Sequence, residues 1–365
     1  MGIDVSRIKF DAAQIAELHE DQRRFIRDTT FQPIDYSLGS IVQLINQKEL
    51  IVDPDFQRRD RWKKAQQSRL IESFFLNIPV PPIFVMSEGL GKMTVIDGQQ
   101  RLLSIAAFFH DELKLTGLGR WKKLNNLYYK DLQAIGLSSI LAQRPLRVFE
   151  LRSDNAETIY DVFSRLNTGG VKLNNQEIRN STFAKYQYNK LIKRLGEDAD
   201  FWGIVGITNH KTERWKNMEN CELVLRYFAI RGEGYTRLSH SVDEFLNLEM
   251  KSKSKEMSSE ELKQLENDFL NTVQCVKKGL GKVACRNPER PKKFMVSAYE
   301  AVMHAFDGKD QGQVEKKSQE LRAGYNELWK DIEYSTLFSK GTNEPKKLAI
   351  RIQRMDEMVN SILSR

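Results

Sequence analysis

The sequence predicts an α+β protein in which a small α/β core is followed by a mostly helical domain. Two observations carry this prediction. Short apolar segments that end at glycine, proline or charged residues are confined to the first 151 residues. From residue 156 onward, apolar residues recur at helical spacing almost to the end of the chain. A length of 365 residues exceeds what one core usually organises, so we expect two domains, 1–185 and 186–365.

The first half alternates predicted helices and strands. Residues 1–36 are predicted to form a helix and then an extended lead-in, after which Ser37 caps a short helix. Leu70, Ile71, Phe74 and Phe75 mark a further helix. Strands are expected at residues 50–52, 82–86, 93–97 and 146–151, whereas residues 111–145 show no regular pattern.

The second half is predicted to be mostly helical. The first helix carries Ile159 to Leu166 and ends at Asn167-Thr168-Gly169-Gly170. Asn174 with Glu177, and Ser258 with Glu261, have the spacing of capping boxes that open two later helices. Further helices are expected near 293–306, 312–332 and 345–363.

Composition narrows the class of protein. Hydrophobic residues make up 40% and charged residues 29%, which is typical of a globular protein. No run of about 18 apolar residues predicts a membrane span, and residues 1–9 do not resemble a secretory signal, so we expect a cytoplasmic protein. Three dispersed cysteines argue against zinc and disulfides. The net charge of +8 permits contact with nucleic acid without requiring it.

The segment Asp97-Gly98-Gln99-Gln100-Arg101 lies where a predicted strand gives way to a predicted helix. Such a junction favours an anion, because the first helical turn has unpaired N–H groups and a partial positive charge. Gly98 allows close approach, and Arg101 supplies a bidentate donor. Gln99 or Gln100 would contact phosphate oxygens or position a water, and Asp97 suits a magnesium ion or an attacking water. The alternative is that Asp97 caps the helix and pairs with Arg101.

Two other segments are candidates for the same site. Phe56-Gln57-Arg58 precedes Trp62, so that Arg58 would meet the same phosphates and Trp62 would stack on a base or sugar. The alternative for Trp62 is a core position beneath a solvated basic loop. Asn167, Thr168 and Arg179 would contribute to nucleotide binding if the fold turned them toward the nucleotide. The alternative is that Gly169 and Gly170 only end a helix and form a turn.

Several other motifs were weighed. Residues 89–94 lack the spacing of a Walker phosphate loop, and no histidine cluster or Ser-His-Asp arrangement is readable. Two basic groups could touch DNA, although such groups are more often solvated surface: Arg286, Arg290, Lys292 and Lys293; Lys346, Lys347, Arg351 and Arg354.

The order of these blocks resembles a known family. Six segments, in this order, together resemble the GmrSD-type N-terminal domain, formerly a domain of unknown function. They are residues 54–58 with Trp62, Ile78-Pro79-Val80-Pro81, Asp97 to Leu102, 163–170, 173–180 and 214–227. The resemblance spans roughly residues 37–230, and it implies a core similar to the ParB and sulfiredoxin nucleotide-binding fold.

The resemblance implies a role in bacterial restriction or anti-phage defence, with binding of a nucleoside triphosphate (NTP) and Mg²⁺ and often hydrolysis. The family's Asp-Gly-Gln-Gln-Arg motif matches this chain without substitution. Expected partners are DNA and a separate nuclease or defence subunit, and a homo-oligomer is allowed. The expected site comprises catalytic residues Asp97, Gln99, Gln100 and Arg101, the metal ligand Asp97, and the nucleotide-binding residues Gly98, Arg101, Gln57, Arg58, Asn167 and Thr168.

Two rival functions remain open at this point. The chain could be a self-sufficient ParB-like DNA nuclease or nickase, or a DNA-binding scaffold without enzymatic activity. Many longer members of the family add an HNH nuclease domain. Residues 230–365 show no paired catalytic histidines or metal-binding cysteines, which argues against autonomous cleavage of DNA.

Overall fold

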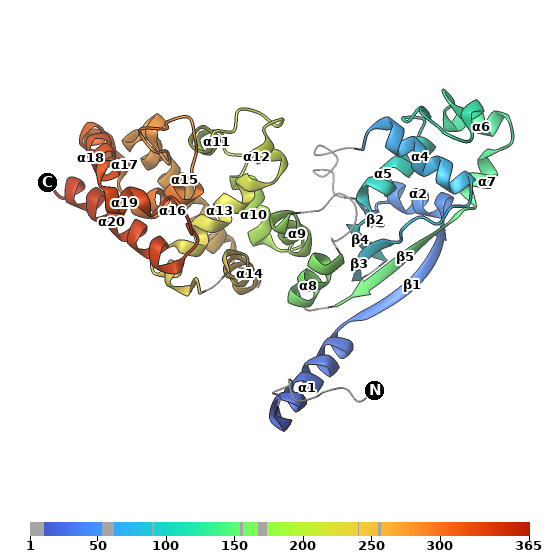
Figure 1. Cartoon of the computed structure of the whole chain (residues 1–365), viewed down its shortest axis with the longest axis horizontal. Helices are drawn as coiled ribbons and strands as arrows, with labels where there is room; N and C mark the ends of the chain where they lie inside the picture. Colours follow the sequence, from blue (N-terminus) through green and yellow to red (C-terminus); the bar gives the residue numbers. More distant parts are fainter. Residues whose placement is uncertain are drawn as a thin grey trace, which may run out of the picture. The chain divides into compact units, whose positions relative to one another are not determined.

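The computed structural model describes residues 11–52, 62–89, 91–153, 156–166, 174–239, 241–254 and 257–365. The chain divides into two compact units, Met1–Lys172 (unit 1) and Leu173–Arg365 (unit 2). Unit 1 contains a small sheet and unit 2 is helical (Figure 1), so the predicted α+β class is confirmed. The predicted domain boundary after residue 185 stays a prediction. None of the described helices combines the length and apolarity of a membrane span.

Unit 1 is built on one five-stranded mixed sheet in the order β1-β5-β3-β4-β2. β5 pairs antiparallel with β1 and parallel with β3, while β4 pairs antiparallel with β3 and parallel with β2. All four predicted strands are confirmed. The strands are β1 Thr30–Ser37, β2 Leu50–Ile51, β3 Ile83–Gly89, β4 Lys92–Asp97 and β5 Pro145–Arg152.

The edge strand β1 differs from the sequence-based expectation, which placed an extended lead-in there. Its side chains are mostly exposed, and Pro33 interrupts its run of backbone donors. A proline is tolerated on an edge strand because its missing N–H faces no partner strand. The strand therefore lacks the alternating apolar pattern that identifies half-buried strands, and it forms because β5 offers it a matching edge.

The core of unit 1 lies between one face of this sheet and helices α2, α4 and α5. Leu38, Ile71, Ile83, Val95 and Phe108 are among its fully buried members. As predicted, Ser37 caps α2. The helices of unit 1 are α1 Ala12–Asp28, α2 Leu38–Asn46, α4 Lys64–Phe75, α5 Gln99–Phe109, α6 Tyr129–Ala134, α7 Ser138–Ala142 and α8 Ala156–Leu166.

The irregular region that begins at residue 111 is fixed to α4 by one buried carboxylate. Glu72 accepts backbone N–H groups of Gly119, Arg120 and Trp121 at 3.2, 2.8 and 2.8 Å. Burial raises the pKa of Glu72, but these three donors outweigh burial and leave the pKa lowered. Trp121 also stacks on Phe75. The loop is thus ordered by tertiary contacts, which no local pattern announces.

Unit 2 consists of helices packed around a core that includes Tyr227, Phe269 and Tyr299. The two predicted capping boxes, Asn174 with Glu177 and Ser258 with Glu261, are confirmed. Its helices are α9 Asn175–Thr182, α10 Gln187–Leu195, α11 Ala199–Val205, α12 Glu213–Lys216, α13 Glu219–Ile230, α14 Val242–Ser252, α15 Ser259–Gly279, α16 Val296–Ala305, α17 Gln311–Lys316, α18 Ser318–Lys330, α19 Ile332–Thr336 and α20 Pro345–Leu363.

Candidate functional site

The segment Asp97–Arg101 forms the predicted strand–turn–helix junction. β4 ends at Asp97, Gly98 occupies the N-cap position, and α5 begins at Gln99. Gly98 has φ +100°, in the left-handed region that side chains disfavour. No side chain makes a capping hydrogen bond at this described junction, so the alternative in which Asp97 caps α5 is wrong. The start of α5 therefore keeps its positive end toward the turn.

Gly98 is required by space as well as by backbone conformation. A Cβ atom at this position would lie 2.2 Å from Cδ1 of Ile83, which is fully buried on β3. It would also lie 3.0 Å from Nη2 of Arg101. Neither contact is tolerable without movement. Gly98 thus lets β4 turn tightly into α5 while the Arg101 guanidinium lies against the turn.

Arg101 is oriented by Asp97. Its Nη2 donates to a carboxylate oxygen of Asp97 at 2.6 Å, and the two side chains are 12% and 29% exposed. This pair is the alternative that the sequence had left open. It does not use the whole guanidinium, because Nε of Arg101 is buried with no hydrogen-bond partner among the described residues. A planar cation with a spare donor is suited to an anion that approaches the turn.

The two glutamines of the motif behave differently. Gln99 is 5% exposed; its amide nitrogen lies 3.5 Å from the Val95 carbonyl, and its Oε1 is buried without a partner among the described residues. Gln100 is 7% exposed, and its Oε1 accepts the backbone N–H of Trp62 at 3.0 Å. Gln99 therefore has an acceptor to spare, whereas the acceptor of Gln100 is used in holding the chain.

The hydrogen bond between Trp62 and Gln100 brings Trp62, which follows the segment Phe56-Gln57-Arg58 in the sequence, to the junction. Trp62 itself is half-buried and packs against the core of unit 1, as the alternative interpretation of this residue expected. Gln57 and Arg58 lie outside the described residues, as do Asn167 and Thr168. Their assignment to nucleotide binding stays a prediction.

The chemistry of the junction suits a phosphate group better than a bare metal ion. Its donors are the first turn of α5 and the unused Nε of Arg101, both of which favour an anion. The described residues contain no cluster of three or more His, Cys, Asp or Glu arranged around a metal. A single carboxylate such as Asp97 is the usual protein contribution where Mg²⁺ is held mainly by phosphates and water.

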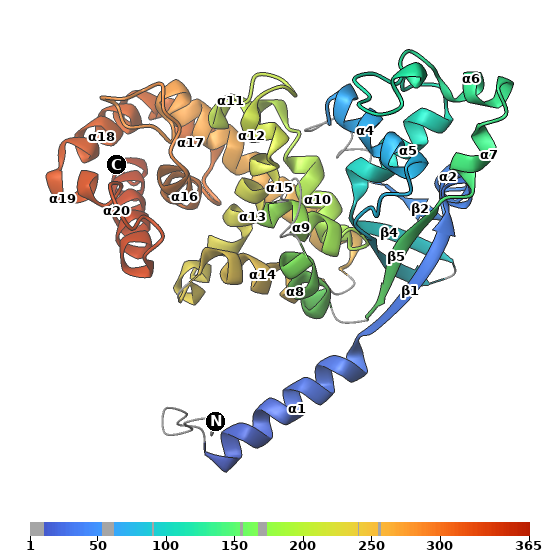
Figure 2. The same ribbon diagram turned by 45° about the vertical axis from the view of Figure 1, so that its right-hand side comes forward.

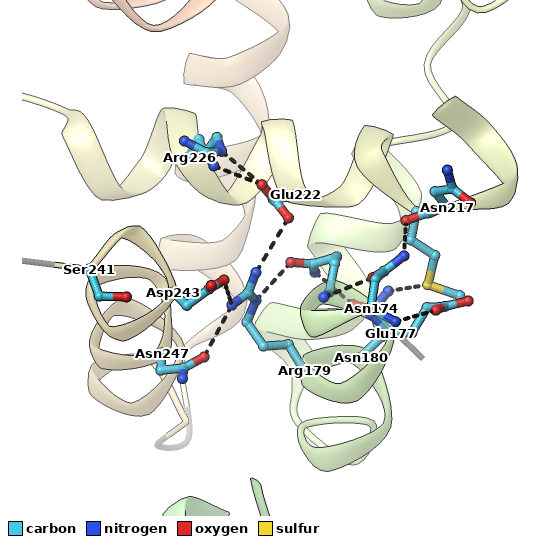
Figure 3. Close-up of polar contacts among 12 residues, drawn as sticks. Asn174, Glu177, Arg179, Asn180, Asn217, Glu222, Arg226, Ser241, Asp243 and Asn247 are labelled. Atoms are coloured by element: carbon cyan, nitrogen blue, oxygen red, sulfur yellow. Dashed lines mark hydrogen bonds and ion pairs between the residues drawn. The ribbon is translucent and has the colours of Figure 1, made fainter. Parts of the chain in front are cut away.

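Arg179, which was considered together with Asn167 and Thr168, is buried inside unit 2. Its Nε donates to Gln176 at 2.9 Å, and its terminal nitrogens contact Asp243, Asn247 and Glu222 at 3.3–3.4 Å (Figure 3). With 0% exposure, Arg179 ties α9 to α13 and α14. A nucleotide-contacting role for Arg179 would have to break this network, so we assign it a positioning role.

A ladder of alternating charges continues from Arg179 through unit 2. Glu222 pairs with Arg226 at 2.9 Å, Arg226 with Glu300 at 2.6 Å, and Glu300 with Arg351 at 3.5 Å. Arg351 also donates to the backbone carbonyls of Leu337, at the end of α19, and of Thr342, before α20. The ladder links α9, α13, α16 and α20. Sequence reasoning missed it, although Glu222 and Arg226 at i, i+4 within an apolar stripe were the available signal.

Three of the basic side chains considered for DNA contact make other contacts. Arg351 is fully buried in the ladder, and Arg354 pairs with Asp331. Lys347 contacts Glu344 and a backbone carbonyl. Arg351 is therefore not part of a solvated basic surface, and the charges of Arg354 and Lys347 are paired with acidic neighbours.

Comparison with known proteins identifies part of the chain. Residues 38–184 match the family model for the N-terminal domain of the GmrSD restriction endonuclease. A search of curated proteins and a search of solved structures each gave no match. The match covers the sheet of unit 1 from α2 onward, the Asp97–Arg101 junction and α9 of unit 2, and it suggests a role in restriction or defence with DNA as a substrate. Over residues 38–184 the chain is therefore similar to the N-terminal domain of the GmrSD restriction endonuclease.

Proposed function

We propose that this chain binds a nucleoside triphosphate at Asp97–Arg101 and hydrolyses it as part of a bacterial restriction or anti-phage system that acts on DNA. The observation that carries the proposal is the pair of unused polar atoms at the junction, Nε of Arg101 and Oε1 of Gln99. Buried polar atoms are rarely left without partners. Their position beside a glycine with positive φ, at a helix N-terminus, suits a bound phosphate.

Each residue of the junction has a role in this proposal. The backbone of Gly98 and the first turn of α5 bind the terminal phosphates, and Arg101 neutralises their charge. As Arg101 turns toward phosphate, the Asp97 carboxylate is released to hold Mg²⁺ or to orient a water. Gln99 positions the attacking water with its unused oxygen, while Gln100 holds Trp62 in place. Bound Mg²⁺ supplies charge neutralisation on the phosphate oxygens.

The helical unit is proposed to respond to the nucleotide. The family match ends at residue 184, so it includes α9, which belongs to unit 2. α9 is fixed by Arg179 to the charge ladder that reaches α20. In this proposal unit 2 relays the nucleotide state to DNA or to a partner subunit, and α9 with its buried network lies at the start of that unit.

The experiment is NTP turnover by the full chain with Mg²⁺, comparing ATP, GTP, CTP and UTP with and without DNA. Asp97→Ala and Arg101→Ala are the test variants. Asp35→Ala and Arg147→Ala are matched controls, because these residues form another Asp–Arg pair in unit 1, on the paired strands β1 and β5. We expect turnover of at least one nucleotide, its loss in both test variants, and wild-type rates in both controls.

Other outcomes would point to the two rival functions. Metal-dependent nicking of plasmid DNA by the purified chain without nucleotide, abolished by Asp97→Ala, would favour a nuclease. Salt-dependent DNA binding with neither binding nor turnover of any nucleotide would favour a scaffold. Either result would overturn the proposal.

A further inference from the structure

The segment between α15 and α16 forms a hairpin with an excess of positive charge. Residues 286–294, called the basic hairpin below, belong to the orange segment that joins these two helices in Figure 2. An antiparallel β-bridge joins Arg286 to Phe294, and backbone hydrogen bonds of 2.9 and 3.1 Å hold the chain between them in two turns. One acidic residue, Glu289, stands among four basic ones, which are Arg286, Arg290, Lys292 and Lys293.

The base of the basic hairpin is fixed to unit 2. The hydroxyl of Tyr325 on α18 donates to the Arg286 carbonyl at 2.8 Å and accepts the Arg286 N–H at 3.2 Å. Pro288 and Pro291 restrict the backbone of the loop itself. A loop that is already ordered loses less conformational entropy when it binds a partner, so its charges are preorganised for binding.

The charges at the tip of the basic hairpin have no acidic partner in the described structure. The side chains of Arg290, Lys292 and Lys293 are exposed and form no hydrogen bond or ion pair with the described residues. The other basic group differs, because acidic neighbours pair with Lys347 and Arg354. Positive charge that the fold leaves uncompensated favours an anionic partner.

Two further guanidinium groups meet at the base of the basic hairpin. Arg214 on α12 stacks on Phe294, with its guanidinium carbon 4.5 Å from the ring centroid. A Cβ atom on Gly206 would lie 3.6 Å from Nη2 of Arg286 and 3.7 Å from Nη1 of Arg214, so the two groups are neighbours around this glycine. Arg214 pairs with Glu219 at 3.0 Å, whereas Arg286 forms no ion pair with the described residues. Two neighbouring guanidinium groups with one carboxylate between them are suited to a phosphate.

The composition of the basic hairpin indicates which anionic partner it fits. Its one aromatic ring, Phe294, is half-buried and lies against Arg214, so it is not free to stack on the bases of a single strand. Residues 286–293 contain no apolar side chain except two prolines, whereas a surface that binds membranes inserts apolar side chains into the lipid. Cations without either feature suit the phosphate backbone of a duplex.

We propose that the basic hairpin, together with Arg214, binds the phosphate backbone of duplex DNA without reading its base sequence. The basic hairpin lies outside residues 38–184, so the family match does not assign this role to it. The inference rests on the part of the proposed function in which the chain acts on DNA. It uses no residue of the Asp97–Arg101 junction and does not depend on nucleotide binding.

Fluorescence anisotropy of a labelled DNA duplex with the full chain, over roughly 50–200 mM salt, tests the proposal. Wild type should bind with an affinity that falls steeply with salt and is the same for duplexes of different sequence. The triple variant Arg290→Gln, Lys292→Gln and Lys293→Gln should bind at least tenfold more weakly at about 100 mM salt. Its slope of log affinity against log salt should be shallower by about 2.7, because each lost phosphate contact removes about 0.9. These side chains make no contacts, so the fold should be retained.

The matched control removes three positive charges from exposed lysines on other elements of unit 2. Its substitutions are Lys263→Gln, Lys340→Gln and Lys346→Gln, and it should keep the affinity and slope of wild type. A triple variant that binds duplex DNA as wild type does would overturn this inference and leave the proposed function standing. Tighter binding of single-stranded DNA or of phosphatidylserine vesicles than of duplex DNA would also overturn it. A wild-type chain that binds no duplex DNA would contradict both.

Discussion

Replacing Gly98 by Ala tests whether the tight β4–α5 turn has the geometry described. The new Cβ would lie 2.2 Å from Cδ1 of Ile83, and the new alanine would have to adopt φ +100°. A left-handed backbone costs an L-residue about 1–2 kcal/mol, and overpacking a closed core costs about 1–3 kcal/mol. We therefore expect the free energy of unfolding of unit 1 to fall by about 2–5 kcal/mol.

Two further variants separate these contributions. Gly136 also has positive φ, at +74°, but a Cβ there meets nothing within 4 Å, so Gly136→Ala should cost only the backbone contribution of about 1–2 kcal/mol. Ile83→Val removes Cδ1 and alone should cost about 0.5–1.5 kcal/mol. Combined with Gly98→Ala, it should return most of the overpacking cost as a favourable coupling energy.

Hydrogen–deuterium exchange of the full chain in increasing urea is the assay. Peptides from β3 and β4 report the opening of unit 1 separately from unit 2. A loss below about 0.5 kcal/mol in Gly98→Ala, or the absence of coupling to Ile83→Val, would refute the packing argument for this turn.

Three other predictions concern the two cores. Glu72→Gln should destabilise unit 1 by about 2 kcal/mol, because an amide NH₂ would face a backbone donor. The pKa of Glu72 is lowered in the fold, so the greater stability of wild type should be present above about pH 4.3 and disappear as pH falls through the folded pKa. Urea unfolding of both proteins at a series of acidic pH values would measure this difference. Burial lowers the pKa of His304, but its hydrogen bond to Asp356 outweighs this and leaves the pKa raised. The stabilisation from His304 should therefore be complete below about pH 6.5 and be lost as pH rises through the folded pKa. Thermal melts would contradict this if the melting temperatures of wild type and His304→Ala differed by the same amount at pH 5.5 and at pH 9. Arg179→Ala should destabilise unit 2 by about 2–3 kcal/mol, which is less than for a fully buried ion pair because Glu222 is 28% exposed. Unchanged hydrogen–deuterium exchange in peptides from α9 and α13 would contradict a stabilising role of this ladder.

Local patterns in the sequence predicted much of the fold. Ser37, Asn174 and Ser258 mark helix starts because their side chains cap the following turn. β3 and β4 are recognisable because their apolar residues form a half-buried sheet around a glycine turn. The strand–turn–helix junction at Gly98 follows from the change of period after Asp97.

What the sequence could not predict depends on distant partners. β1 is a strand because β5 pairs with it, and the region after residue 111 is ordered because Glu72 lies beneath it. The burial of Arg351 requires Glu300, which is 51 residues away. At the candidate site, the pentapeptide was predicted, but the unused atoms on Arg101 and Gln99 follow from tertiary packing.

Equilibrium binding of nucleotides tests the central claim most directly. Calorimetric titration of the full chain with ATP, GTP, CTP and UTP in the presence of Mg²⁺ should show binding of at least one of them. Arg101→Ala should weaken that binding by about 1.5–3 kcal/mol, or roughly 10–150-fold, while Arg147→Ala leaves it unchanged. Absence of binding by every nucleotide, or equal affinity in wild type and Arg101→Ala, would contradict a nucleotide site at Asp97–Arg101.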